Sequence, residues 1–450
     1  MHNENKMGYM PMGKLVFSMS LPMIISMLVQ ACYNIIDSIY ISRFSEEALA
    51  AVSYAFPAQN LMIGFATGVG VGVNALLSKS LGEKNYDRAN RTAGNGFLLA
   101  CICYVLFLLF GLFGANWFIA FQTKTESIIQ YGTDYLSICC IFSFGIFGEI
   151  LFERFMQATG RTLLSMFTQG LGALCNIILD PIFIFGYFGL PAMGAKGAAI
   201  ATVIGQILAC ILAIILNHFK NPDVQLTADT FKPEKLIVGR ILEVGVPSVL
   251  MMAVGTLMTT GMNKILNKFS DLAVTVFGVY FKLQSFAFMP VFGLNNGVIP
   301  IIAFNYGARH RKRMLSAVKI GVVTATGFML LGLVVMQCFP AQALSLFDAS
   351  EQMLAIGVPA LRIISISYIF AGACIAVSSV FQALGHGTYS TIVSVCRQLL
   401  ILLPAAYLFS LSGKLNLVWV AFPLAEIMSI TVTLLLFLHL YKKVIRDIPE

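Results

Sequence analysis

The spacing of charged residues constrains the fold of this chain more than any other feature of its sequence. Charges gather in clusters, and the apolar stretches between them exceed the roughly 20 residues that a helix needs to cross about 30 Å of hydrocarbon. Of the 450 residues, 58% are hydrophobic and 11% are charged, whereas soluble domains carry roughly 25% charged residues. Such a composition cannot cover a surface in water, so we predict an all-α integral membrane protein.

The apolar stretches predict twelve transmembrane helices, and the lipid bilayer is therefore the first predicted partner. The ten cysteines lie in apolar stretches without a C-x-x-C pair or a histidine cluster, so the sequence indicates no disulfide framework, structural metal or cofactor. The predicted spans are 14–41, 48–78, 93–116, 130–153, 162–186, 195–219, 237–266, 273–304, 317–339, 353–381, 388–411 and 414–441.

Basic residues predict the orientation of these spans. The tail before Lys14 is polar and no small-residue cleavage site follows the first span, so we expect the tail to stay attached. Twenty of the 29 Lys and Arg residues fall on the side of the N-terminus and six on the other side. The positive-inside rule then places both termini in the cytoplasm and the protein in the inner (plasma) membrane. The net charge of +8 is thus explained by topology, and nucleic acid is not a predicted partner.

An internal repeat divides the chain into two halves. When the sequence is aligned with itself, the same offset of 225 residues relates positions from the first span to about Ser390, beyond which the register blurs. The matching pairs include Pro22 and Pro247, Gln59 and Gln284, Gly68 and Gly293, Gly72 and Gly297, Gly82 and Gly307, Arg88 and Arg313, and Gly160 and Gly385.

The repeat predicts two six-helix bundles related by a pseudo-two-fold axis along the membrane normal, because each half holds an even number of spans. We predict an N-terminal bundle over 1–219, a polar cytoplasmic linker over 220–236 and a C-terminal bundle over 237–450. Two homologous bundles that rock about a central site are typical of transporters, whereas a channel pore is more often built from several identical subunits.

Carboxylates inside the predicted spans are the strongest functional signal. A charged side chain at a span centre costs at least about 2.5–3.5 kcal/mol, so it normally faces a cavity or a partner. Asp37 in the first span and Asp180 in the fifth are the clearest cases, and Tyr33 and Asn34 share the helix face of Asp37. Asn176 lies one helical turn before Asp180 on the same face.

Other polar residues of the first half are weaker candidates. Thr202 and Gln206 form a polar pair in the sixth span. Glu149 and Glu153 share a face near the cytoplasmic end of the fourth span and are candidates to face a substrate, although Glu153 could equally pair with a base.

The second half does not repeat these acids. At the offset of 225, Asp37 corresponds to Met262 and Asp180 to Ala405. A polar group needed only to hold helices together should recur in both halves, so its absence favours a functional role for the two aspartates. Arg397 and Glu426 are expected to neutralise each other in the second half.

These residues resemble the multidrug and toxic compound extrusion (MATE) family over nearly the whole chain, and most closely its MepA-type bacterial branch. The resemblance is carried by Leu21-Pro22 with Asp37, by the string Asn176-Ile-Ile-Leu-Asp180-Pro181, and by Gln157-Ala-Thr-Gly160, Gln382-Ala-Leu-Gly385 and Ala421-Phe-Pro-Leu-Ala-Glu426.

The resemblance implies an antiporter that exports amphipathic, often cationic small molecules in exchange for Na⁺ or H⁺ by alternating access, and we expect it to act as a monomer. It also implies that the coupling ion binds at Asp37, Asn176, Asp180 and Thr202, with Tyr33, Asn34 and Gln206 as supporting polar groups.

Two alternatives from other classes remain at this point. One is a lipid-linked saccharide flippase of the same superfamily, against which twelve rather than fourteen spans argue. The other is a membrane enzyme, an interpretation that rests only on the H-x4-D spacing of His218 and Asp223. We expect that the chain is not an enzyme.

Overall fold

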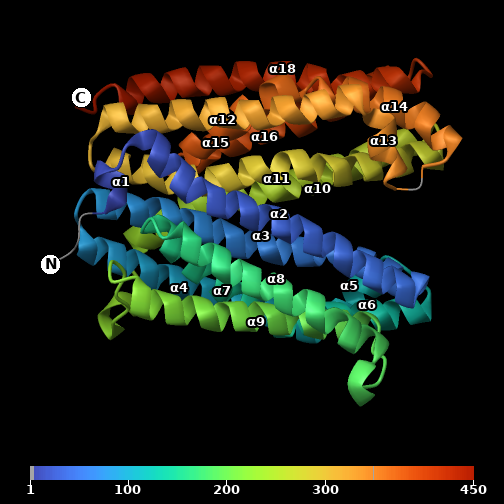
Figure 1. Cartoon of the computed structure of the whole chain (residues 1–450), viewed down its shortest axis with the longest axis horizontal. Helices are drawn as coiled ribbons and strands as arrows, with labels where there is room; N and C mark the ends of the chain where they lie inside the picture. The colour runs from blue at the N-terminus through green and yellow to red at the C-terminus, as the bar shows by residue number, and fades with distance from the viewer. Residues whose placement is uncertain (1–4, 348, 450) are drawn as a thin grey trace.

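The computed structural model describes residues 5–347 and 349–449, and within these residues every regular element is a helix. Figure 1 shows the helices running nearly parallel along the long axis, with both chain ends at the same end of the molecule. The helices are α1 (Lys6–Tyr9), α2 (Met12–Phe44), α3 (Glu46–Gly82), α4 (Tyr86–Leu109), η1 (Phe110–Gly114), α5 (Ala115–Ala120), α6 (Glu126–Ile141), α7 (Phe144–Ala158), α8 (Thr162–Phe185), η2 (Tyr187–Gly189), α9 (Ala195–Lys220), η3 (Ala228–Phe231), α10 (Lys235–Asn267), α11 (Asp271–Gly307), α12 (Arg311–Cys338), α13 (Pro340–Ser345), α14 (Glu351–Ser365), α15 (Tyr368–Ala383), α16 (Gly387–Val395), η4 (Cys396–Leu402), α17 (Leu403–Ser410), α18 (Leu415–Leu440) and η5 (Tyr441–Ile445).

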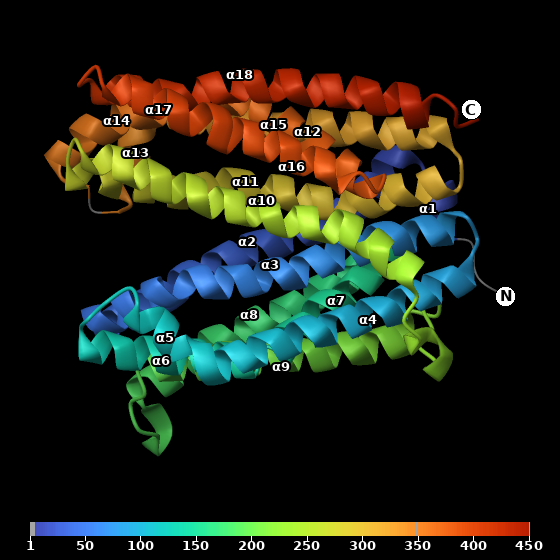
Figure 2. The same cartoon turned by 180° about the vertical axis from the view of Figure 1, so that it is seen from behind.

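The helices form two bundles, one from α2–α9 and one from α10–α18, which we call the N-bundle and the C-bundle (Figures 1 and 2). We call the end that holds both termini and most basic residues the basic end. In Figure 2 the bundles meet near the basic end and diverge toward the opposite end. The two-bundle fold predicted from the repeat is confirmed.

Twelve spans are also confirmed, with two of them bent. Within residues 5–347 and 349–449, ten helices are long and apolar enough to cross a membrane, and two bent pairs supply the others. The pairs are α6 with α7, bent by 45°, and α14 with α15, bent by 51°. The two pairs begin at Glu126 and Glu351, which the repeat relates, so the bend belongs to the repeated unit rather than to either half.

Equivalent serines begin equivalent helices in the two halves. Ser45 accepts hydrogen bonds from the backbone N–H groups of Glu47 and Ala48 at the start of α3. Ser270 accepts one from Ala273 at the start of α11. A side-chain acceptor at this position satisfies N–H groups that have no partner within the helix. The reversal between the first two spans of each bundle is therefore encoded locally.

The register of the repeat shifts before its last span. The connection before α9 covers residues 186–194, whereas the connection before α18 covers only 411–414. The shorter loop changes the offset to 220, which aligns Ala195–Lys220 with Leu415–Leu440 and Gln206 with Glu426. Buried positions agree with this register, since Ala201, Ala209 and Ala213 of α9 correspond to the buried positions 421, 429 and 433.

Glycines allow the bundles to touch in the halves of the helices nearer the basic end. A β-carbon at Gly68 of α3 would lie 2.7 Å from the carbonyl oxygen of Gly245 in α10. A β-carbon at Gly293 of α11 would lie 2.6 Å from Cα of Ile24 in α2. Gly68 and Gly293 are related by the repeat, so the two contacts form a pseudo-symmetric pair. The absence of side chains at these positions therefore allows close packing of helices from the two bundles.

The segment between the bundles is more ordered than the polar tether expected over 220–236. Asn95 of α4 donates to the carbonyl of Lys232 at 3.1 Å and accepts from the N–H of Glu234 at 2.8 Å. Asp223 accepts a 2.5 Å hydrogen bond from Arg161. Asp223 of the H-x4-D pair therefore has a structural partner that links the segment to the N-bundle.

Candidate functional site

Four polar residues predicted as an ion site converge inside the N-bundle, and we call them the carboxyl site: Asp37, Asn176, Asp180 and Thr202. They come from α2, α8 and α9. Asp180 is fully buried and Asn176 is 3% exposed, although both lie in a helix that is otherwise mostly apolar. The one-turn spacing of Asn176 and Asp180 on α8 brings both side chains to the same face, as the sequence predicted.

Asn176 connects two of the three helices. Its amide nitrogen donates to Oδ2 of Asp180 at 2.9 Å, and its amide oxygen accepts from Oγ1 of Thr202 at 3.1 Å and from the Thr202 N–H at 3.3 Å. Gly205 of α9 permits the close approach of α8, because a β-carbon at this position would lie 2.8 Å from the carbonyl oxygen of Gly172. Close packing of α8 on α9 therefore positions Thr202.

Asp37 completes the site from α2. Its carboxyl interacts with the carboxyl of Asp180. One of its oxygens, Oδ1, is buried and accepts no hydrogen bond from the described residues. No Lys, Arg or His within the described residues forms an ion pair with either aspartate. Two facing carboxyls at this depth need a proton or a monovalent cation between them, and the oxygen-rich lining fits either.

The helix around this site is continuous despite its proline. Pro181 lacks the N–H that would close the helical bond to the carbonyl four residues earlier, yet α8 continues to Phe185. The helix thus agrees with the predicted span 162–186, which continues through Pro181. Packing of α8 against α9 and α2 holds the last turn in place.

The supporting residues separate into two groups. Tyr33 lies one turn before Asp37, is partly buried, and interacts electrostatically with Asp37, Glu149 and Asp180. Gln206 is partly buried one turn beyond Thr202. Asn34 is exposed, so the face that it was predicted to share with Asp37 extends away from the buried carboxyls.

Glu149 and Glu153 lie on α7 inside the N-bundle. Glu153 is 3% exposed, and its carboxyl oxygens accept from Oγ1 of Thr168 and Nε2 of Gln169, each at 2.7 Å. Glu149 is partly buried beside Gly172 of α8. In this conformation Glu153 therefore faces α8 rather than open space.

Sequence reasoning missed the importance of Arg154. It was assigned to a cytoplasmic connection, but it lies inside α7 and is 8% exposed. Its guanidinium donates to Gln157 at 2.8 Å and to Asn296 of α11 at 3.0 Å, so it joins the two bundles. Its adjacency to two intramembrane glutamates was the available sequence signal.

Among the described residues of the C-bundle there is no equivalent carboxyl site. Met262, the counterpart of Asp37, is fully buried among apolar residues. Arg397 and Glu426 lie 3.5 Å apart and form the expected ion pair, with side chains 26% and 7% exposed. The pair neutralises both charges inside the bundle.

We expect removal of one member of that pair to destabilise the protein. Glu426→Ala should lower the free energy of unfolding by about 2 kcal/mol because it leaves the partly buried guanidinium of Arg397 without its partner. The combined change Arg397→Met with Glu426→Leu should recover most of the loss. Denaturant unfolding in micelles measures both, and a single variant as stable as the parent would contradict the inferred contribution.

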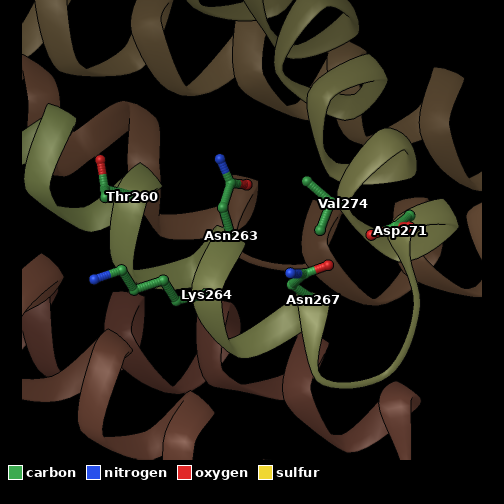
Figure 3. A pocket seen from close by; sticks show the side chains of 6 residues that line it. All are labelled: Thr260, Asn263, Lys264, Asn267, Asp271 and Val274. Atoms are coloured by element: carbon green, nitrogen blue, oxygen red, sulfur yellow. The ribbon is translucent and has the colours of Figure 1, made fainter. Parts of the chain in front are cut away.

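A separate polar pocket of about 420 Å³ lies at the end of the C-bundle opposite the basic end. Figure 3 shows its lining from α10 and α11, with Asn263 and Lys264 on α10 and Asp271 and Val274 near the start of α11. It belongs to the C-bundle, whereas the carboxyl site lies in the N-bundle. Lys264 makes it less suited to a cation than the carboxyl site is.

Comparison with known proteins agrees with this architecture. The model of the MatE family matches residues 22–182 and 247–408, two stretches whose starts lie 225 residues apart. The chain is 25% identical over 408 residues to multidrug export protein MepA of Staphylococcus haemolyticus, covering 90% of this chain and 89% of that protein. It is 26% identical over 427 residues to an FAD transporter of Shewanella oneidensis, covering 93% and 92%.

Solved structures show the same fold. A structure described as the outward-facing conformation of a multidrug resistance MATE family transporter matches with a TM-score of 0.93 and 23% identity, covering 99% of each chain. A crystal structure of MATE in complex with MaL6 matches with a TM-score of 0.91 and 24% identity, covering 98% of this chain and 100% of the other. Since the family model covers more than half of the sequence, this chain belongs to the MatE family of multi-pass membrane transporters, in the branch that includes MepA, and it is not an enzyme.

Proposed function

We propose that this protein exports amphipathic, cationic small molecules in exchange for H⁺ or Na⁺ by alternating access. The observation that carries the proposal is the carboxyl site, a pair of facing acids without a basic partner among the described residues. Ionisation of both acids in such a pair is unfavourable because the two charges repel each other. Binding of one proton or one monovalent cation relieves this repulsion. The related protein named as a multidrug export protein supports the choice of substrates.

The arrangement of the bundles supports alternating access. They touch near the basic end through glycines and through the hydrogen bond from Arg154 to Asn296, and they diverge at the other end. If the basic end is cytoplasmic, this conformation is closed to the cytoplasm. An ion can drive the exchange only if it binds differently when the bundles separate at the basic end.

The test is transport in proteoliposomes that contain the purified protein. Tetraphenylphosphonium, a lipophilic cation, should move against its gradient when a H⁺ or Na⁺ gradient of the opposite direction is imposed, and each ion is supplied separately. Movement that is unaffected by both gradients would refute antiport. The relative named as an FAD transporter gives a second candidate substrate class, so FAD is tested in parallel; driven FAD movement without phosphonium movement would favour it.

We propose that both termini are cytoplasmic, as the basic residues indicate. A cysteine introduced at Asp447, in the exposed C-terminal segment, should resist an impermeant maleimide in intact cells and react after the cells are lysed. A cysteine at Lys414, between α17 and α18 at the opposite end, should react in intact cells. The reverse pattern would contradict this topology.

A further inference from the structure

A line of polar side chains extends from the carboxyl site toward the basic end of the N-bundle. The line follows one face of α8, with one adjacent pair and otherwise successive members three or four residues apart. Because α8 starts at the basic end, the members nearest its first residue are closest to that end. The positions in this line are Ser165, Thr168, Gln169, Gly172, Asn176 and Asp180.

Glutamates of α7 fill the middle of this line. Gly172 has no side chain, and Oε1 of Glu149 lies 3.6 Å from the place where its β-carbon would be. One turn along α7, Glu153 accepts hydrogen bonds from Thr168 and Gln169, and its backbone carbonyl accepts from Ser165 at 3.2 Å. The two glutamates are four residues apart and influence each other electrostatically.

Glu149 differs from Glu153 in what surrounds it. Among the described residues it has no ion pair and no hydrogen bond to its carboxyl. The titratable groups near it are Tyr33 of α2, Glu153 of α7 and Cys210 of α9. Tyr33 also interacts electrostatically with Asp37 and Asp180. Gly172, beside which Glu149 lies, is one helical turn from Asn176 of the carboxyl site.

The second half of the chain has no such line. At the offset of 225 the counterparts of Glu149 and Glu153 are Cys374 and Ser378, and the counterpart of Asp37 is Met262. The glutamates and the aspartates thus occur together in one bundle and are absent together from the other. A packing requirement of the repeated fold would apply to both bundles, whereas a shared role in ion transfer explains their joint presence.

We propose that Glu149 is a proton-binding site that transfers protons between the carboxyl site and the basic end. A proton leaves the Asp37–Asp180 pair, which gains one negative charge, and neutralises the Glu149 carboxylate through Tyr33 or water. Glu149 then passes the proton to ionised Glu153, which releases it at the basic end. The inference rests on the proposed antiport and specifies its ion as H⁺, because each step of this transfer moves a proton from one carboxyl to the next.

Glu149→Gln tests the transfer because it keeps the size of the side chain and removes its acidity. In proteoliposomes, tetraphenylphosphonium movement driven by a pH gradient should fall about a hundredfold. Exchange of labelled for unlabelled phosphonium at equal pH on both sides needs no net proton release and should stay within about twofold. Glu149→Asp should restore part of the driven movement. Glu126→Gln, at the exposed start of α6, is the matched control.

Each outcome has a distinct meaning. Driven movement by Glu149→Gln equal to that of the parent would refute the transfer role. If Glu149→Gln loses driven movement and exchange equally, and Glu149→Asp is also inactive, Glu149 acts in substrate binding or bundle movement. That result would also refute the transfer role. If the parent responds to a Na⁺ gradient and not to pH, the transfer role fails while the proposed antiport survives. If the parent responds to neither, the proposed antiport itself fails.

Discussion

Asp37→Asn and Asp180→Asn are each expected to abolish gradient-driven export while the protein stays folded and inserted. Asparagine keeps the shape of aspartate but cannot carry the negative charge that attracts a proton or cation. When one aspartate is replaced by a neutral amide, the remaining carboxylate no longer faces a second negative charge. Binding of a proton or cation then relieves no repulsion between two acids and is weaker. Moving one charge against 100 mV costs about 2.3 kcal/mol, and without the ion this work has no source.

The measurement is phosphonium movement under an imposed gradient in proteoliposomes, where each variant should match vesicles without protein. Stability in detergent should equal or exceed that of the parent, because the change relieves the crowding of two buried acids. Met262→Leu, which alters the repeat-related position with no change in charge, is the matched control and should transport normally. If both asparagine variants transport like the parent, coupling does not occur at the carboxyl site.

A crosslink between the bundles is expected to stop transport completely and reversibly. A β-carbon at Gly64 of α3 would lie 3.9 Å from Cβ of Met252 in α10, within the range that a disulfide spans. Gly64→Cys with Met252→Cys, in a background without the other cysteines, should therefore join the bundles. If alternating access requires α3 and α10 to separate here, the joined protein remains in one conformation.

Oxidation should reduce phosphonium movement to the level of empty vesicles, and a reductant should restore it. Each single cysteine variant should be insensitive to oxidation, which separates the effect of the crosslink from that of the substitutions. Mass spectrometry of the digested protein confirms that the disulfide has formed. Undiminished transport by the crosslinked protein would contradict separation of the bundles at this depth.

The sequence alone determined the membrane class, the spans and the two-bundle architecture. The membrane class and the spans follow from local composition, since a stretch of apolar residues partitions into lipid whatever it later packs against. The two bundles follow from the offset of 225, which the sequence shows without any knowledge of contacts, and Ser45 and Ser270 begin equivalent helices at that offset. The one-turn spacing of Asn176 and Asp180 likewise defines a shared helix face before any tertiary contact forms.

Only the tertiary structure decided which polar residues meet. Asp37 is 143 positions from Asp180 along the chain, and their proximity depends on α2 packing against α8. The exposure of Asn34, the burial of Arg154 against Asn296 and the place of Glu149 beside Gly172 depend in the same way on neighbouring helices. The periodicity of a helix fixes the direction in which each side chain points around the helix axis. The partner that the side chain meets is set by the packing of helices that are distant in sequence.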